Sequence, residues 1–164
     1  MALPDDYIAD ARAAASVSTT QQSLLRRATS TAYYALFLEL VDSVGNILAP
    51  HAPSGLRTLV GRKLAHEQMK KACAQWNGGG NPWTTALAMA APPQSLKDVA
   101  AAFVELQQLR HEADYDLDAA FSSVTVQANI ERAENAITRW RQIKTSNPDH
   151  ASVVMVSLMH TSPR

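Results

Sequence analysis

Apolar residues recur along most of the chain at the spacing of an α-helix, and this pattern predicts helices almost throughout. The longest predicted helix covers 24–48, where steps of about 100° per residue gather apolar side chains on one side. Tyr33 and Phe37 lie at the edge of this apolar stripe, beside Arg26 and Ser30. The stripe itself consists of Leu25, Ala28, Ala32, Leu36 and Leu40.

Prolines and acidic residues indicate where the first helices begin and end. Pro4, followed by Asp5 and Asp6, predicts a short leading helix to about residue 15, since acids in the first turn complement the helix dipole. The long helix should stop before Pro50, because a proline disfavours helix in the residue before it. The loop expected after it covers 51–55.

A third helix is predicted at 56–76, with Leu59, Leu64 and Met69 as possible core residues. It is followed at 77–82 by the sequence NGGGNP, which is the clearest flexible break in the chain. We therefore expect one continuous helix between the 51–55 loop and this break.

Two further helices are expected in the second half of the chain. A short helical turn at 83–91 precedes a proline pair, after which Ser95 caps the fourth helix. The fifth helix follows 122–125 and ends near Asn147. The apolar stripes of these two helices are Val99, Phe103 and Leu106, and Ile130, Ala133, Ile137 and Trp140.

These elements predict an all-α protein, an up-and-down bundle of four main helices with a short N-terminal helix and a C-terminal extension. We divide it into a helical bundle at 1–146 and a tail at 147–164. The apolar part of this tail, 153–159, fits a strand, a helical turn or a packing arm, and the sequence leaves all three open.

The length and the net charge of the chain limit the functions it can have. The chain has 164 residues and balances 15 Lys and Arg against 15 Asp and Glu, which fits one domain and argues against wholesale coating of a polyanion. The N-terminus lacks the apolar core of a signal peptide, and no apolar run reaches the length of a membrane helix, about 18 residues. We expect a soluble, cytoplasmic protein that does not engage membranes.

No common metal or cofactor motif occurs in the sequence. Cys73 is the single cysteine, so neither an internal disulfide nor a zinc-type cluster can form from it. His66 and Glu67 do not begin an H-E-x-x-H motif, because Lys70 stands at the position of the second histidine. We therefore predict no cofactor and no metal.

Arg110 is the most informative single residue. It continues the apolar stripe of its helix and should point toward the bundle, with Asp114 four residues further along nearly the same line. One interpretation is an ion pair that seals the end of the bundle. The other is a guanidinium held in a partly buried groove, where its planar donors bind a phosphate. Spacing alone favours the ion pair.

A polar and aromatic seam on the long helix has the same two interpretations. Its residues are Arg26, Arg27, Ser30, Tyr33 and Tyr34. Boundary tyrosines usually bury the ring and satisfy the hydroxyl, which is a packing role. The same residue types could line a groove for a nucleotide base and its phosphate.

Two segments together resemble the HEPN superfamily (higher eukaryotes and prokaryotes nucleotide-binding). The first is Ser-Thr-Ala-Tyr-Tyr-Ala-Leu-Phe at 30–37, which is similar to the S-x-A-Y-Y-A-x-F pattern of a HEPN second helix. The second is Arg-His-Glu-Ala-Asp-Tyr at 110–115, which is similar to the R-x-x-A-D-Y pattern of a fourth helix. The order of the two segments and the distance between them in the sequence both fit the superfamily, and the resemblance covers 5–146.

The resemblance implies a helical bundle, frequently a homodimer, with a cleft around Arg110. It also implies links to RNA cleavage, toxin–antitoxin pairs or defence systems, often beside a nucleotidyltransferase partner. Nuclease members of the superfamily carry a histidine a few residues after this arginine, whereas this chain has Tyr115 there. His111 lies about 100° around the helix from Arg110 and should point away from the groove.

Three hypotheses follow, in order of preference. The first is a HEPN-like domain that binds RNA or a nucleotide through Arg110, with Ser30, Tyr33 or Tyr34 nearby. The second is an atypical metal-independent ribonuclease toxin, in which Arg110 stabilises the phosphate and Tyr115, His111 or His66 assists proton transfer. The third is a non-catalytic protein-interaction module that docks a partner through an apolar surface such as 153–159. Trp76 and Trp83 could belong to the core or to a partner surface.

Overall fold

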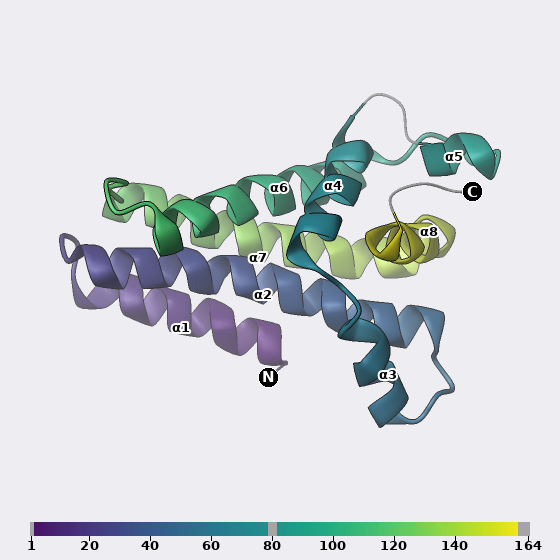
Figure 1. Cartoon of the computed structure of the whole chain (residues 1–164), viewed down its shortest axis with the longest axis horizontal. Helices are drawn as coiled ribbons and strands as arrows, with labels where there is room; N and C mark the ends of the chain where they lie inside the picture. The colour runs from purple at the N-terminus through teal and green to yellow at the C-terminus, as the bar shows by residue number, and fades with distance from the viewer. Residues whose placement is uncertain (1, 79–81, 161–164) are drawn as a thin grey trace. The chain divides into compact units, whose positions relative to one another are not determined.

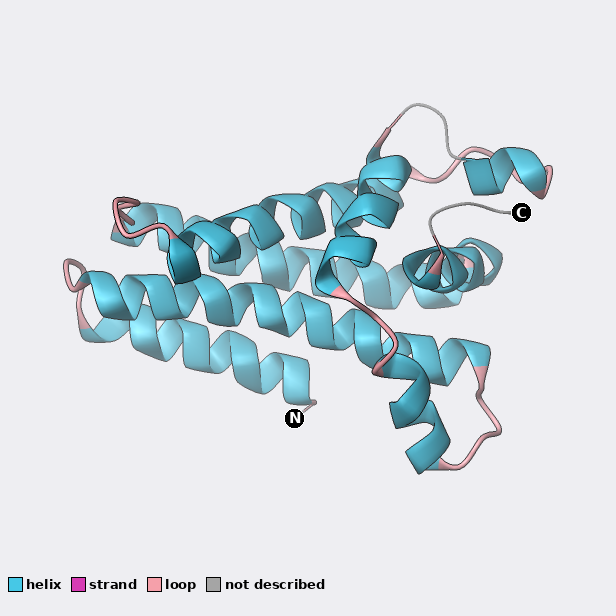
Figure 2. Ribbon diagram, viewed as in Figure 1, coloured by secondary structure: helices cyan, strands magenta, loops and turns pink. Residues whose placement is uncertain are grey.

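The computed structural model describes residues 2–78 and 82–160. In these residues the chain forms eight helices and no strand (Figures 1 and 2). The prediction of an all-helical bundle is confirmed. In chain order the helices are α1 (Leu3–Val17), α2 (Gln22–Leu48), α3 (Ser54–Gly61), α4 (His66–Asn77), α5 (Pro82–Ala86), α6 (Gln94–Tyr115), α7 (Ser123–Ser146) and α8 (Pro148–Met159).

The chain divides into two compact units. Unit 1 joins the chain up to Leu38 with Ala102–Ile137, and unit 2 joins Glu39–Ala101 with the chain from Thr138 onward. Helices α2, α6 and α7 therefore contribute residues to both units. The predicted division into a 1–146 bundle and a 147–164 tail stays a prediction.

Unit 1 contains α1, the first part of α2, the second part of α6 and the first part of α7. Polar contacts join helices across it: Arg12 of α1 pairs with Glu134 of α7, and Glu105 of α6 pairs with Arg132 of α7. The fully buried side chains include those of Leu25, Ala32, Tyr33, Phe103, Leu106, Val126 and Ile130. Most of these residues belong to the predicted stripes, which therefore supply much of the core of unit 1.

The helix boundaries of unit 1 follow the sequence signals closely. Pro4, Asp5 and Asp6 stand in the first turn of α1, as predicted. The hydroxyl oxygen of Ser122 accepts a hydrogen bond of 3.1 Å from the backbone N–H of Thr125, which caps the start of α7.

Unit 2 is built around two tryptophans. Trp76 and Trp140 are fully buried, and each indole N–H donates to a serine hydroxyl, Trp76 to Ser157 at 2.7 Å and Trp140 to Ser43 at 2.9 Å. Because a buried indole N–H needs a partner, these bonds fix the orientation of both rings. Trp83 is also buried. Trp76 and Trp83 therefore belong to the core.

The apolar tail is a helix. Residues 153–159 lie in α8, where Val154, Met155 and Leu158 are buried in unit 2. Of the alternatives that the sequence left open, the helix is thus the one found, and its apolar face packs against the rest of this unit. The side chains of this face are not available as an exposed docking surface.

The prediction of one continuous helix at 56–76 is wrong. The chain leaves α3 at Gly61, turns through 62–65 and restarts with α4 at His66. This turn changes the phase between the two halves, so Leu64 and Met69 are buried as predicted whereas Leu59 is 56 % exposed.

Helix α3 packs against α2 at two glycines. A Cβ atom added to Gly45 would lie 2.7 Å from the backbone oxygen of Arg57, and one added to Gly61 would lie 3.0 Å from Cγ1 of Val41. The absence of side chains at both glycines lets the two helices approach this closely.

A buried carboxylate also stabilises unit 2. Glu39 is 5 % exposed and pairs with Arg141 at 2.8 Å and with Lys144 at 2.9 Å. Two cations compensate one buried anion, which meets the requirement that a buried charge be paired.

Candidate functional site

The two sequence segments that carry the HEPN resemblance meet in unit 1. Ser30 and Tyr34 stand one turn apart on α2, and Arg110 and Asp114 stand one turn apart on α6. Both pairs have i, i+4 spacing, so each presents two side chains on one face of its helix. The four residues form a single polar cluster between the two helices.

Two nitrogen atoms of the Arg110 guanidinium have polar partners. Its Nε atom lies 2.7 Å from Oδ2 of Asp114, and its Nη2 atom donates a hydrogen bond of 2.9 Å to the hydroxyl of Tyr34. The hydroxyl of Ser30 in turn donates to Oδ1 of Asp114 at 2.5 Å. The guanidinium is therefore fixed by an anchored carboxylate and by a phenol.

Two aromatic rings also face this guanidinium. Its central carbon lies 5.5 Å from the ring centre of Tyr34 and 5.5 Å from that of Tyr115. Both distances are within the range of cation–π attraction, about 6 Å. A planar cation between aromatic rings retains a fixed orientation, which is a condition for directional recognition of an anion.

The cluster is partly open to solvent. The side chain of Arg110 is 17 % exposed and that of Asp114 is 29 % exposed. Burial disfavours the charged guanidinium, but Asp114, followed by Tyr34 and Tyr115, more than offsets this effect and raises the pKa of Arg110 above its ordinary value. Within the described residues Nη1 makes no hydrogen bond, so this edge is free to contact a ligand.

Arg26 has a structural role in this fold. Its guanidinium lies 5.7 Å from the ring centre of Phe121 and donates to backbone carbonyls at the end of α6 and in the turn that follows. Carbonyls at a helix C-terminus have no partner within the helix, and a nearby cation satisfies them and complements the dipole. The acceptors are Glu112, Ala113, Asp116, Leu117 and Ala119.

Two other residues of the predicted seam lie apart from the polar cluster. Tyr33 is fully buried, and its ring packs against Phe37 and Phe103, with ring centres 6.0 Å and 5.5 Å away. This placement favours the packing role that the sequence left open. Arg27 is exposed on α2.

His111 and Tyr115 form an exposed pair on the outer side of α6. Their ring centres are 5.1 Å apart, and Tyr115 also contacts Arg110. Tyr115 thus contacts both His111 and Arg110, and the direction expected for His111 stays a prediction. His66 begins α4 and belongs to unit 2, whereas the residues of the polar cluster belong to unit 1.

The described residues contain no group of three or more His, Cys, Asp or Glu side chains arranged to hold a metal ion. None of the helices in the same residues is both long and apolar enough to cross a bilayer.

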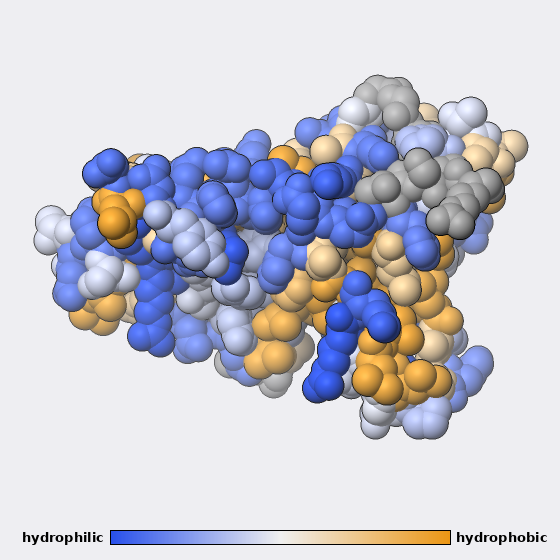
Figure 3. Space-filling model, viewed as in Figure 1, coloured by the Kyte–Doolittle hydropathy of each residue, from blue (hydrophilic) through white to orange (hydrophobic). Residues whose placement is uncertain are grey.

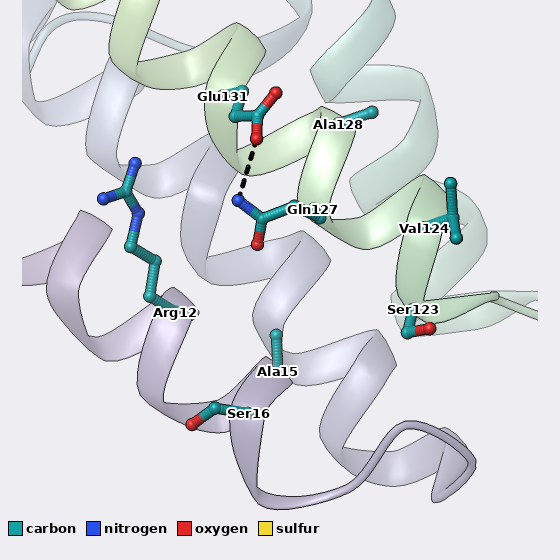
Figure 4. Close-up of a pocket in the computed structure, with 8 residues that line it drawn as sticks. All are labelled: Arg12, Ala15, Ser16, Ser123, Val124, Gln127, Ala128 and Glu131. Carbon is teal, nitrogen blue, oxygen red and sulfur yellow. Dashed lines mark hydrogen bonds between the residues drawn. The ribbon is translucent and has the colours of Figure 1, made fainter.

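A groove in unit 1 was not predicted from the sequence. An open groove of about 560 Å³ lies between α1 and α7, with Arg12 on one wall and Gln127 and Glu131 on the other (Figure 4). Gln127 donates to Glu131 at 3.0 Å, and Arg12 pairs with Glu134. Small side chains also line this groove, namely Ala15, Ser16, Ser123 and Ala128. Small residues of this kind give no distinctive signal in a sequence.

Comparisons with known protein families, with curated proteins and with solved structures find no match for this chain. The candidate site therefore stands on its own geometry.

Proposed function

We propose that the chain is a HEPN-like helical domain that binds RNA or a nucleotide through Arg110. The observation that supports this most directly is the fixed guanidinium of Arg110, which is held by Asp114 and Tyr34 while its Nη1 edge remains open. A phosphate oxygen is a strong acceptor for such a donor, because both partners are charged. Tyr115, which is 63 % exposed, stands beside the guanidinium and offers a ring face to a base.

The strength of this binding is limited by nearby charge. Residues 112–118 contain four acids and no Lys or Arg. They repel a long polyanion, so we expect binding through few phosphates. Because each phosphate contact contributes to the salt dependence of binding, the affinity should fall only shallowly with increasing salt.

The decisive test compares Arg110→Ala with the wild-type protein in binding a fluorescent single-stranded RNA at low salt. We expect Arg110→Ala to lower the affinity by about tenfold or more, since a charge-assisted hydrogen bond contributes about 1.5–3 kcal/mol. Arg110→Lys should restore only part of it, because lysine lacks the planar donor fork. Circular dichroism should show the same helical content in all three proteins.

Arg139→Ala provides the matched control, because Arg139 is an exposed arginine of unit 2. An equal loss of affinity in this variant would mean that RNA binds non-specifically to positive charge, and the proposal would fail. Unfolding of Arg110→Ala would instead assign the cluster a purely structural role.

The contact between His111 and Tyr115 favours a second candidate function, that of a metal-independent ribonuclease. Here Arg110 would stabilise the phosphate and the adjoining pair would move the proton. The same labelled RNA, incubated without metal, reports on this directly. Cleavage that is lost in both Arg110→Ala and His111→Ala would establish catalysis.

The remaining proposals follow from the resemblance alone. They are a homodimer, a nucleotidyltransferase-type partner protein, and a place in a toxin–antitoxin or defence system. A cytoplasmic location is a proposal from the sequence pattern. Co-expression with a neighbouring nucleotidyltransferase gene product, followed by co-purification, tests the partnership.

A further inference from the structure

Charge is unevenly distributed along this chain, although its net charge is zero. Residues 51–71 contain five Lys or Arg and one Glu, a net charge of +4. Residues 112–118 contain four acids and no base, a net charge of −4. The two segments therefore carry opposite charges of equal size, one in unit 2 and the other in unit 1.

The basic segment presents leucines to solvent. Leu56 and Leu59 are i, i+3 neighbours on α3 and are 50 % and 56 % exposed, because α3 packs against α2 on its other side, through Gly61. The exposed Arg62 and Lys63 follow directly. Figure 3 shows a hydrophobic area at α3 with hydrophilic groups beside it. We call Leu56, Leu59, Arg62 and Lys63 the α3 surface.

The acidic segment also presents a leucine. Leu117 is 90 % exposed between the exposed Asp116 and Asp118, and we call these three residues the turn surface. The turn is well defined, because the carboxylate of Asp116 accepts hydrogen bonds from the backbone N–H groups of Asp118 and Ala119. Arg26 holds the carbonyl oxygen of Leu117 from the other side. A fixed turn that exposes an apolar side chain loses little conformational entropy on binding.

Neither surface suits a contact with its own copy. If two α3 surfaces met, Arg62 and Lys63 would face their own copies, and if two turn surfaces met, Asp116 and Asp118 would do so. Like charges at an interface are unfavourable. The two surfaces are opposite in charge, and both carry exposed leucines that burial would remove from water.

We propose that the α3 surface of one copy binds the turn surface of a second copy. The contact joins two different surfaces, so it can close reciprocally in a dimer or continue into a ring or an open chain. Because the contact depends on exposed charges, it weakens as salt shortens the screening length, which is about 10 Å at 0.1 M and about 3 Å at 1 M. The inference is independent of nucleotide binding.

Two variants test the contact, each at exposed positions. The α3 variant is Leu59→Glu with Lys63→Glu, and the turn variant is Leu117→Lys with Asp118→Lys. Each alone should lower the self-association constant by about tenfold or more in sedimentation velocity, because like charges then meet across the contact. Asp10→Lys repeats the charge change of Asp118→Lys on exposed α1 and should associate as the wild type does.

The sharpest measurement is the mixture of the two variants. The α3 variant retains an intact turn surface and the turn variant retains an intact α3 surface, so equal amounts should associate with each other although each variant alone does not. Circular dichroism confirms that both variants are folded, and the single changes Lys63→Glu and Asp118→Lys repeat the test in milder form.

Three results would overturn the inference. The first is a wild-type protein that remains monomeric at low salt and high concentration. The second is a variant that self-associates as strongly as the wild type, which would place the interface elsewhere. The third is a mixture of the two variants in which the α3 variant and the turn variant do not associate.

Discussion

At the scale of single residues, the site could be predicted where it depends on spacing within a helix. The i, i+4 relation of Arg110 and Asp114 was readable from the sequence, and the structure shows both the ion pair and an accessible guanidinium edge. The role of Arg26 was not readable, because its acceptors are carbonyls of a turn far along the chain. Backbone acceptors have no side-chain identity that a sequence pattern could reveal.

The buried thiol of Cys73 leads to a prediction about pH and reactivity. Burial raises its pKa from 9.0 to about 12, so the folded protein keeps the thiol protonated where the unfolded chain begins to ionise. The stability that this group contributes is complete below about pH 9 and is lost as pH rises from about 9 toward 12. A thiol-specific reagent at pH 8 should react with the native protein far more slowly than with the urea-unfolded chain.

Cys73→Ala serves as the control in the same experiment. Its denaturant midpoint should fall less steeply above pH 9 than that of the wild type, because the variant has no thiol to ionise. Equal pH dependence of the two proteins, or rapid labelling of the native thiol, would contradict the burial of Cys73.

At the scale of elements, the periodicity of apolar residues located most of the helices but did not reveal the turn between α3 and α4. The 56–76 stretch kept a helical pattern of apolar residues across a turn, and a pattern of this kind does not reveal a change of phase. Gly61 has low helix propensity and stands in this stretch, at the end of α3. The packing of α3 on α2 explains the need for a glycine there, and that packing involves residues from another helix.

The approach of α3 to α2 leads to a prediction about Gly45→Ala. Alanine favours a helix over glycine by about 1 kcal/mol, but its Cβ would lie 2.7 Å from the backbone oxygen of Arg57. Backbone atoms cannot yield without moving α3, and overpacking typically costs about 1–3 kcal/mol. We therefore expect a net loss of stability, measured as a lower denaturant midpoint.

Gly55→Ala is the matched change on the same pair of helices. A Cβ added to Gly55 has nothing within 4 Å, so only the helix-propensity term remains. Gly55→Ala should be neutral or stabilising by up to about 1 kcal/mol. Stabilisation by both substitutions would show that α3 does not pack closely on α2.

At the scale of the whole molecule, the sequence predicted an all-helical chain but gave no sign of two compact units. The reason is that α2, α6 and α7 are continuous in sequence while their residues divide between the two units. Unit membership depends on contacts between distant segments. The tail was ambiguous for the same reason, because its apolar residues fitted any element until their partners were known.

Removal of α8 tests how far unit 2 depends on its C-terminal segment. Truncation after Asn147 removes the buried Val154, Met155 and Leu158 and leaves the indole N–H of Trp76 without its Ser157 acceptor. Loss of large buried apolar side chains costs about 2–5 kcal/mol each, so we expect unit 2 to lose its fixed packing. Tryptophan fluorescence should shift to the red as Trp76 becomes hydrated, and a truncated protein with unchanged emission would contradict this role of α8.

The contacts of Arg26 have a consequence for how the molecule folds. Its carbonyl acceptors stand between 86 and 93 positions further along the chain. No local encounter can bring this guanidinium to the end of α6, since closing so long a loop costs entropy before any contact offsets it. The hydrogen bonds from Arg26 to the turn around Leu117 therefore form only after α2 has docked against α6. During synthesis the guanidinium must wait for almost the whole of α6 before its acceptors exist.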